Sequence, residues 1–381
     1  MHIVINGWFW DQTHAGSGQY LRQLVEHLPR AAPELRLTLV VPRATSDQQA
    51  AASKLRQLRL YPAPSSRSNL GKVWFEQVTF PRLCRQLQAD VAHVPYWGSP
   101  LSPNLPTVVS VLDLIPMLLA EYRGGPLVRL YTGLVAAAAQ NAAQVLTISE
   151  ASKRDIVSHL RIPAGRVHVT HLAAGRRFTP QPDPAGDSAL RQRHPGLPRK
   201  YVLYLGGVDA RKNVETLVQM CTWLQRAFGT EFPLVLAGGL PEQHDRFFRD
   251  PRALARSFEV EELVCCIGPV AEEDKPALYR GASAFLFPSR YEGFGLPVLE
   301  ALACGSPVVG SDASSIPEIV GDAGILVDPD DAERMAGGLI AVLNDGELHR
   351  ELSQRAVAQA ARFSWERCAR QTAEVYRLAQ N

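Results

Sequence analysis

Residues 289–300 read Ser289-Arg290-Tyr291-Glu292-Gly293-Phe294-Gly295-Leu296-Pro297-Val298-Leu299-Glu300. The apolar run Ala284-Phe285-Leu286-Phe287 stands before them and predicts a buried strand, whereas the residues from Pro297 to Ala303 predict a helix. Proline is well tolerated at the first helical position, which places Glu300 in the opening turn of this helix. The chain is therefore expected to pass here from a sheet to a helix, through a turn that holds Gly293 and Gly295.

This turn offers an anion site with a carboxylate on each side. Gly293 and Gly295 let the backbone approach a ligand closely, and the start of a helix leaves N–H groups without partners. A bound phosphate would repel Glu292 and Glu300, so these side chains are expected to accept hydrogen bonds from neutral hydroxyl groups of the same ligand. A phosphate between hydroxyl-rich groups is the pattern of a nucleotide sugar. The alternative is an ordinary helix start with a stabilising acid, and the turn alone does not separate the two.

The stretch resembles the paired-glutamate signature of the GT4 family of retaining glycosyltransferases, because both glutamates, both glycines and the proline stand in register. In that family the first glutamate contacts the donor sugar and the second holds the nucleotide ribose. The resemblance implies these roles for Glu292 and Glu300. It also implies that backbone amides of the donor-binding turn contact the sugar hydroxyls and the phosphate, namely those of Gly293, Phe294, Gly295 and Leu296.

A second motif places two cations after a predicted strand. Arg211 and Lys212 follow the apolar run 201–205 and stand near the start of a helix, where positive charge opposes the helix dipole. A nearby anion explains them better than helix stability does, and a surface pair is the alternative. In the GT4 family the lysine of this motif binds the donor diphosphate, which implies that role for Lys212 and, with it, Arg211. Val270 falls where family members contact the nucleotide base.

The composition describes a globular protein large enough for two domains. The chain has 381 residues, of which 46% are hydrophobic and 20% charged, and its net charge of +2 gives no case for a nucleic-acid partner. We find neither a signal peptide nor an apolar stretch of about 18 residues that could span a bilayer. The six cysteines show no Cys-x-x-Cys spacing, which favours buried free thiols. The expected location is the cytoplasm.

Strand and helix patterns alternate along the chain, which predicts an α/β protein with parallel sheets covered on both faces. The resemblance implies the GT-B fold, in which two Rossmann-like doubly wound domains face a central cleft. We expect an acceptor-binding domain at 1–175, a linker rich in Gly, Pro and Arg at 176–198, and a nucleotide-sugar-binding domain at 199–363. Residues 364–381 are expected to form a helix, capped by Ser364, that packs back on the first domain.

The N-terminal region offers a second loop of the strand, glycine, helix type. Gly16 and Gly18 stand between the predicted strand 1–6 and a predicted helix, although the third glycine of the dinucleotide fingerprint is missing. A similar loop faces the cleft in the GT4 family, which implies that both glycines approach the donor phosphate or the acceptor. The aromatic residues of the same loop could stack on sugars or pack beneath it, and these are Trp8, Phe9 and Trp10.

Leu112 is a departure from the family pattern. Many GT4 enzymes carry a histidine at the end of the corresponding strand, beside the transferred sugar, and a leucine can neither donate a hydrogen bond nor carry a proton. Asp113 is the nearest group that could reach a sugar hydroxyl or orient the acceptor. A helix cap or turn is the alternative role for Asp113.

Residues 43–85 carry eight basic side chains and two acidic ones, a net charge of +6. A solvated face explains this excess. The alternative is peripheral contact with the inner membrane surface or with a lipid phosphate of the acceptor.

Together these features predict a retaining hexosyltransferase with Glu292, Lys212 and Asp113 in the catalytic centre. The donor is a nucleotide-diphosphate sugar, with GDP-mannose slightly favoured over UDP-hexoses, and the acceptor is a glycan, a lipid-linked sugar or a small molecule. No Asp-x-Asp pair stands at a strand end, so we expect no metal cofactor. A sugar-nucleotide epimerase of the same fold and a non-catalytic donor-binding subunit are the alternatives. Linkage and oligomeric state stay open.

Overall fold

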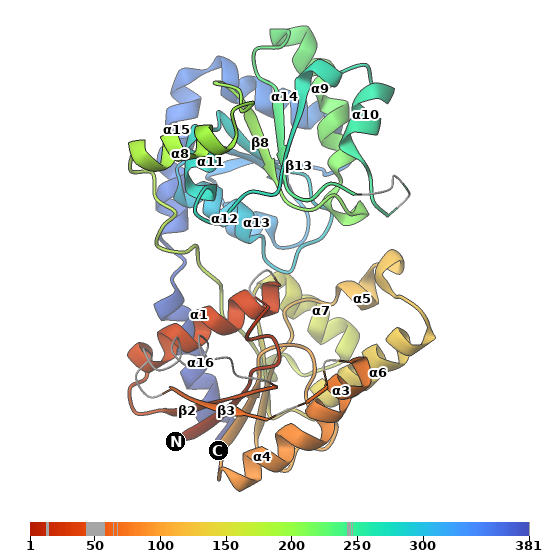
Figure 1. Ribbon diagram of the computed structural model, residues 1–381, viewed down its shortest axis with the longest axis vertical. Coiled ribbons are helices and arrows are strands. Elements are labelled where there is room, and N and C mark those ends of the chain that lie inside the picture. Colours follow the sequence, from red (N-terminus) through yellow and green to blue (C-terminus); the bar gives the residue numbers. More distant parts are fainter. Residues whose placement is uncertain are drawn as a thin grey trace. The chain divides into compact units, whose positions relative to one another are not determined.

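The computed structural model describes residues 1–12, 15–42, 58–63, 65–66, 68–241, 245 and 247–380. It divides into two compact units (Figure 1). The first contains Met1–Leu172 and Ser364–Asn381, and the second contains Ala173–Phe363. None of the helices in these described ranges has the length and apolar character needed to cross a bilayer. All six cysteines are free, and four of them are buried.

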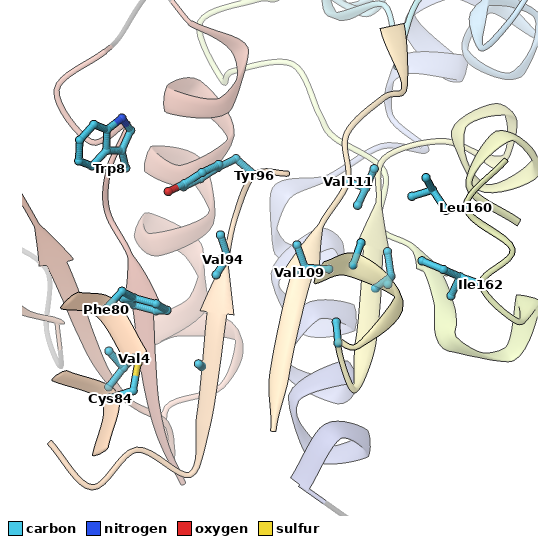
Figure 2. Close-up of a cluster of buried hydrophobic side chains, with 14 of the residues drawn as sticks. Val4, Trp8, Phe80, Cys84, Val94, Tyr96, Val109, Val111, Leu160 and Ile162 are labelled. Carbon is cyan, nitrogen blue, oxygen red and sulfur yellow. The ribbon is translucent and has the colours of Figure 1, made fainter. Parts of the chain in front are cut away.

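The first unit is built on a seven-stranded parallel sheet in the order β3-β2-β1-β4-β5-β6-β7. Its strands are β1 (His2–Asn6), β2 (Arg36–Val41), β3 (Leu58–Pro62), β4 (Val91–Val94), β5 (Thr107–Ser110), β6 (Gln144–Thr147) and β7 (Val167–Val169). Among the residues described, its α- and π-helices are α1 (Gly16–Ala31), α3 (Asn69–Trp74), a π-helix (Phe75–Thr79), α4 (Phe80–Gln86), α5 (Ile115–Leu118), α6 (Pro126–Gln140), α7 (Glu150–Leu160) and α16 (Trp365–Gln380). Figure 2 shows part of the apolar core, where Val4, Val94 and Val109 belong to neighbouring strands.

The second unit has a six-stranded parallel sheet in the order β10-β9-β8-β11-β12-β13. Its strands are β8 (Val202–Leu205), β9 (Leu234–Ala237), β10 (Val264–Gly268), β11 (Ala284–Phe287), β12 (Val308–Ser311) and β13 (Gly324–Val327). Its helices are α8 (Pro184–Arg193), α9 (Val214–Phe228), α10 (Pro251–Ser257), α11 (Lys275–Gly281), α12 (Leu296–Ala303), α13 (Ile316–Val320), α14 (Ala332–Asn344) and α15 (Gly346–Ala360). Two doubly wound parallel α/β units are thus confirmed, and in the second sheet the strand order reverses between β8 and β11.

The stretch 176–198, predicted as a linker, belongs to the second unit and includes a helix. It contains α8, which packs against α11 within the second unit. The Asp183 carboxylate caps this helix by accepting a hydrogen bond from the N–H of Gly186 at 3.1 Å, and Pro184 occupies one of its first positions. Proline at a helix start and aspartate before it are ordinary N-terminal signals, which the assignment of residues 176–198 to a linker did not take into account.

Helix α16 is anchored to the first unit by a buried polar network. It packs along α1, and the cap predicted at Ser364 is present, because the Ser364 hydroxyl accepts from the N–H of Arg367 at 3.0 Å. The Tyr376 hydroxyl lies 2.7 Å from Nδ1 of His93 on β4, and Nε2 of His93 lies 2.9 Å from the Ser110 hydroxyl on β5. Burial lowers the pKa of His93 to about 3, so the ring is neutral in the folded protein.

This network predicts a pH-dependent stability. The pKa of His93 is lower in the folded state than in the unfolded state, so its stabilising contribution is complete above the unfolded value and is lost as the pH falls. Between pH 7 and pH 5 the histidine becomes protonated in the unfolded state but stays neutral in the folded state. This difference lowers the free energy of unfolding by about 2 kcal/mol. Wild-type protein should therefore lose more stability than His93→Gln when the pH is lowered from 7 to 5, and the difference, measured by urea unfolding, should be about 2 kcal/mol. Identical pH slopes would contradict the assignment.

Candidate functional site

The site begins where two neighbouring strands of the second unit end. Strands β8 and β11 pair in parallel, with Ala284 opposite Val202 and Phe285 opposite Leu203. Because parallel strands end at the same edge of a sheet, the loops that follow them meet there. The loop after β8 forms a short 3-10 helix, Ala210–Lys212, and the loop after β11 carries Glu292.

These two loops bring one carboxylate between two cations. Lys212 Nζ lies 2.6 Å from Glu292 Oε1, and Arg211 Nη1 lies 2.8 Å from Glu292 Oε2. All three side chains are only 11–13% exposed. Burial alone would raise the pKa of Glu292, but the charges of Lys212 and Arg211 outweigh it and hold the pKa below its ordinary value. Asp209 Oδ1 lies 3.5 Å from Arg211 Nε, so two carboxylates balance the two cations, and an anionic ligand has to replace a carboxylate to bind them.

A third loop holds the backbone of the glycine-rich turn. It follows β12, the other neighbour of β11, and carries Ser314 and Ser315. The Ser314 hydroxyl donates to the carbonyl of Glu292 at 2.6 Å, and the Ser315 hydroxyl donates to the carbonyl of Phe294 at 2.6 Å. Neither serine was predicted as part of the site, although two adjacent hydroxyl groups shortly after a buried strand were a visible signal.

Gly295 is required by the geometry of the turn. Its φ is +110°, and a Cβ at this position would lie 2.8 Å from the side chain of Ile316. Gly295 stands just before α12, which begins at Leu296, one residue before the predicted start at Pro297. Glu300 is therefore not in the opening turn, as the sequence suggested, but directly after it.

Glu300 has surroundings that differ from those of Glu292. Its Oε2 accepts a hydrogen bond from the buried Tyr279 hydroxyl at 3.0 Å. Burial raises the pKa of Glu300 to about 7, against the opposing effects of the Lys275 charge and the Tyr279 hydrogen bond. Tyr279 could not be predicted as a partner from the sequence, because it stands on α11, a different helix.

A cavity of about 220 Å³ lies at the same edge of the sheet, beside the ends of β8, β9 and β10. Val270 lines it, as do Gly206 and Gly207. Lys275, whose charge opposes the rise in the pKa of Glu300, also lines this cavity. The structure thus places Arg211, Lys212 and Glu292 in one cluster, Val270 in the wall of the cavity, and Glu300 against Tyr279.

The predicted site residues of the first unit make local contacts. A Cβ at Gly18 would lie 2.0 Å from the carbonyl oxygen of Gln12, so Gly18 is needed for the loop to fold on itself, whereas Gly16 has open space around it. The Asp113 carboxylate accepts from the N–H of Ile115 at 3.0 Å, which is the turn alternative. Contacts of Gly16, Gly18 and Asp113 with a ligand stay predictions.

The aromatic loop residues are engaged in packing. Trp8 and Trp10 are each 4% exposed, the Trp8 ring lies 5.3 Å from that of Phe75, and the Phe9 ring lies 4.8 Å from that of Tyr96. In the basic segment, Arg43, Lys54, Arg56 and Arg67 lie outside the described residues. Among the residues that are described, no group of three His, Cys, Asp or Glu side chains is placed to hold a metal ion. Independence of metal stays a prediction.

Two family descriptions match this chain and together span most of it. Residues 189–359 match "Glycosyl transferases group 1", and residues 14–173 match "Glycosyltransferase Family 4". The chain belongs to the GT4 family of glycosyltransferases, as its paired glutamates indicate. Its fold is that of the GT-B glycosyltransferases, as the solved structures below show.

Several relatives and solved structures are similar to the chain. O-antigen chain mannosyltransferase B of Escherichia coli is 36% identical over 61% of this chain and 60% of its own length. The serotype-specific mannosyltransferase WbdA of Escherichia coli is 33% identical over 69% of this chain and only 32% of its own length. Sucrose-phosphate synthase from Thermosynechococcus elongatus has a TM-score of 0.76 at 22% identity, covering 99% of this chain and 98% of its own. Anabaena HepE in complex with UDP-glucose has a TM-score of 0.71 at 17% identity, covering 98% of each chain.

The charge cluster predicts unequal costs for removing its members. Glu292→Gln leaves two cations without the carboxylate that they share, and we expect a loss of about 3 kcal/mol in the free energy of unfolding. Lys212→Met leaves Arg211 paired with Glu292, and we expect a loss of about 1 kcal/mol. Urea unfolding of the ligand-free variants measures both values. A larger loss for Lys212→Met than for Glu292→Gln would show that the cluster is not held by its carboxylate.

Proposed function

We propose that this protein transfers a hexose from a nucleotide-diphosphate sugar to an acceptor hydroxyl, with retention of the anomeric configuration. The observation that supports it best is the pairing of Arg211 and Lys212 with Glu292 beside the glycine turn at the start of α12. A diphosphate is the anion that such a turn and two cations would bind, and Glu300 one loop away is suited to a ribose hydroxyl.

Donor binding would rearrange this cluster. In the ligand-free protein the Glu292 carboxylate occupies the two cations. A diphosphate brings two negative charges and more acceptor oxygens, so it would take over Lys212 and Arg211 and release Glu292 to accept from a sugar hydroxyl. Lys212 and the amides of Gly295 and Leu296 would then stabilise the charge that develops on the departing phosphate.

The donor that we favour is GDP-mannose. The support is that O-antigen chain mannosyltransferase B and WbdA, both named for mannosyl transfer, are 36% and 33% identical to this chain over their matched segments. A UDP-hexose is the second choice, and the acceptor would be a growing glycan or a lipid-linked sugar. Attack on the same face of the sugar, with the leaving phosphate taking the acceptor proton, requires no protein base, so Leu112 is compatible with catalysis and no metal is needed.

A screen of nucleotide sugars tests the activity itself. GDP-mannose and UDP-glucose are each incubated with mannose-containing oligosaccharides, and the product linkage is read by NMR. Transfer with an α product from an α donor supports the proposal. Recovery of an epimerised donor would favour the epimerase, and donor binding without transfer or hydrolysis would favour a non-catalytic subunit.

Two substitutions should separate the nucleoside from the diphosphate. Glu300→Ala should weaken binding of the nucleoside and the nucleoside diphosphate alike by about tenfold, because the ribose loses its acceptor. Lys212→Ala should weaken only the diphosphate, by about tenfold or more. Calorimetric titration measures each affinity, with Lys200→Ala, an exposed lysine of the same unit, as the matched control. Unchanged nucleotide affinity in both variants would remove the assignment.

The raised pKa of Glu300, about 7, gives a pH dependence with a defined sign. Only the ionised carboxylate accepts from two ribose hydroxyls, so affinity should increase as the pH rises through that value. Between pH 6 and pH 8 the dissociation constant for the nucleotide sugar should fall about tenfold, because the ionised fraction of Glu300 rises by that factor. A nucleotide sugar is the right ligand because its diphosphate does not titrate in this range. Glu300→Gln should abolish the dependence, and persistence of the same slope would contradict the role.

A further inference from the structure

The second unit contains another cavity that shares no lining residue with the region described above. It has a volume of about 390 Å³, within the range of small-molecule sites, and it lies between α8, α11 and the residue that follows α12. Helices α8 and α11 lie beside each other in Figure 1. Much of the wall is apolar or aromatic, with Pro180, Pro182, Leu190 and Ala277 joined by the buried Tyr201. The Tyr201 hydroxyl donates to the carbonyl of Leu278 at 2.8 Å. Its polar atom is therefore already paired, and the residue contributes an aromatic ring to the wall.

Arg280 supplies a charged group at this cavity that is incompletely paired. Its side chain is 10% exposed, and Nη2 donates to Asp187 Oδ1 at 2.9 Å. Its Nε is buried and has no hydrogen-bond partner in the described part of the chain. A buried donor without a partner is unfavourable, and the planar edge of a guanidinium group fits a carboxylate.

The charge of the cavity has the same sign as Arg280. Arg191 also lines it, on α8, so two guanidinium groups face a single carboxylate, that of Asp187. Asp187 is 48% exposed and accepts from Arg280 through one oxygen. A second carboxylate could therefore bind at Nε without displacing Asp187, and Arg191 would balance its charge.

We propose that this cavity is a second ligand site, which takes a small carboxylate with an apolar or aromatic body. The carboxylate accepts from Nε of Arg280, and the body packs against Tyr201 and the prolines. The site does not depend on the proposed glycosyl transfer, because its ligand is bound by residues that have no part in the donor cluster.

The test uses 4-fluorobenzoate as the probe and 19F NMR of the full chain as the measurement. We expect saturable binding, and binding of the neutral 4-fluorobenzamide that is weaker by about tenfold or more, because the amide brings no charge to Arg280. Excess GDP should leave the affinity for 4-fluorobenzoate unchanged. Absence of saturable binding, equal binding of the amide, or competitive displacement by GDP would overturn the proposal.

Two variants locate the bound probe. Arg280→Gln removes the charge and Nε, and Pro182→Trp adds bulk to the cavity wall at an exposed position while leaving Arg280 in place. Each should weaken 4-fluorobenzoate about tenfold or more, whereas Arg199→Gln, an exposed arginine that does not line the cavity, should leave binding unchanged. If Arg280→Gln fails to fold, the affinity of Pro182→Trp for 4-fluorobenzoate is sufficient to test the proposal. Wild-type affinity in folded Pro182→Trp would overturn the proposal.

Discussion

The parallel pairing of β8 with β11 is the constraint on which the site of the second unit depends. It brings the ends of two chain segments about 80 residues apart to one edge, so that Glu292 reaches both Arg211 and Lys212. The loops are also joined through the backbone, where the N–H of Arg290 donates to the carbonyl of Arg211 at 2.9 Å. Loss of this register would separate the charges, and an isolated Glu292 at this depth would favour protonation.

The central strands could be predicted from the sequence, whereas some edge strands could not. Strand β11 is a continuous apolar run because helices cover both faces of a parallel sheet there. Strand β3, Leu58–Pro62, lies at an edge, and its burial ranges from buried to exposed along five residues. Its arginine made it look like part of a solvated basic segment. The short edge strand β7, Val167–Val169, has too few residues to show a period.

The site could be predicted only where a residue's own type revealed its role. Two glutamates around a glycine turn and two cations before a helix are unusual in themselves, so they could be singled out. Tyr279, Ser314 and Ser315 are ordinary residues whose roles arise from strand order and helix packing, which the sequence does not state. The role of Asp113 could not be decided from its residue type, because a single carboxylate after a strand can either stabilise a turn or bind a ligand. In the structure it accepts a hydrogen bond within a turn.

Glu292 and Glu300 show how the same side chain is adapted to two tasks by its neighbours. Burial favours the protonated form of both. Two cations in direct contact hold the pKa of Glu292 low, whereas Glu300 has a phenol in contact and the charge of Lys275 as its strongest favourable charge. Glu292 is therefore a permanent anion that must be displaced from its cations before it can contact a sugar. Glu300 makes no strong ion pair. As a consequence its pKa is about 7, and about half of the carboxyl groups are ionised at neutral pH. A carboxylate left in that state is well suited to exchange its weak partners for the hydroxyl groups of a ligand.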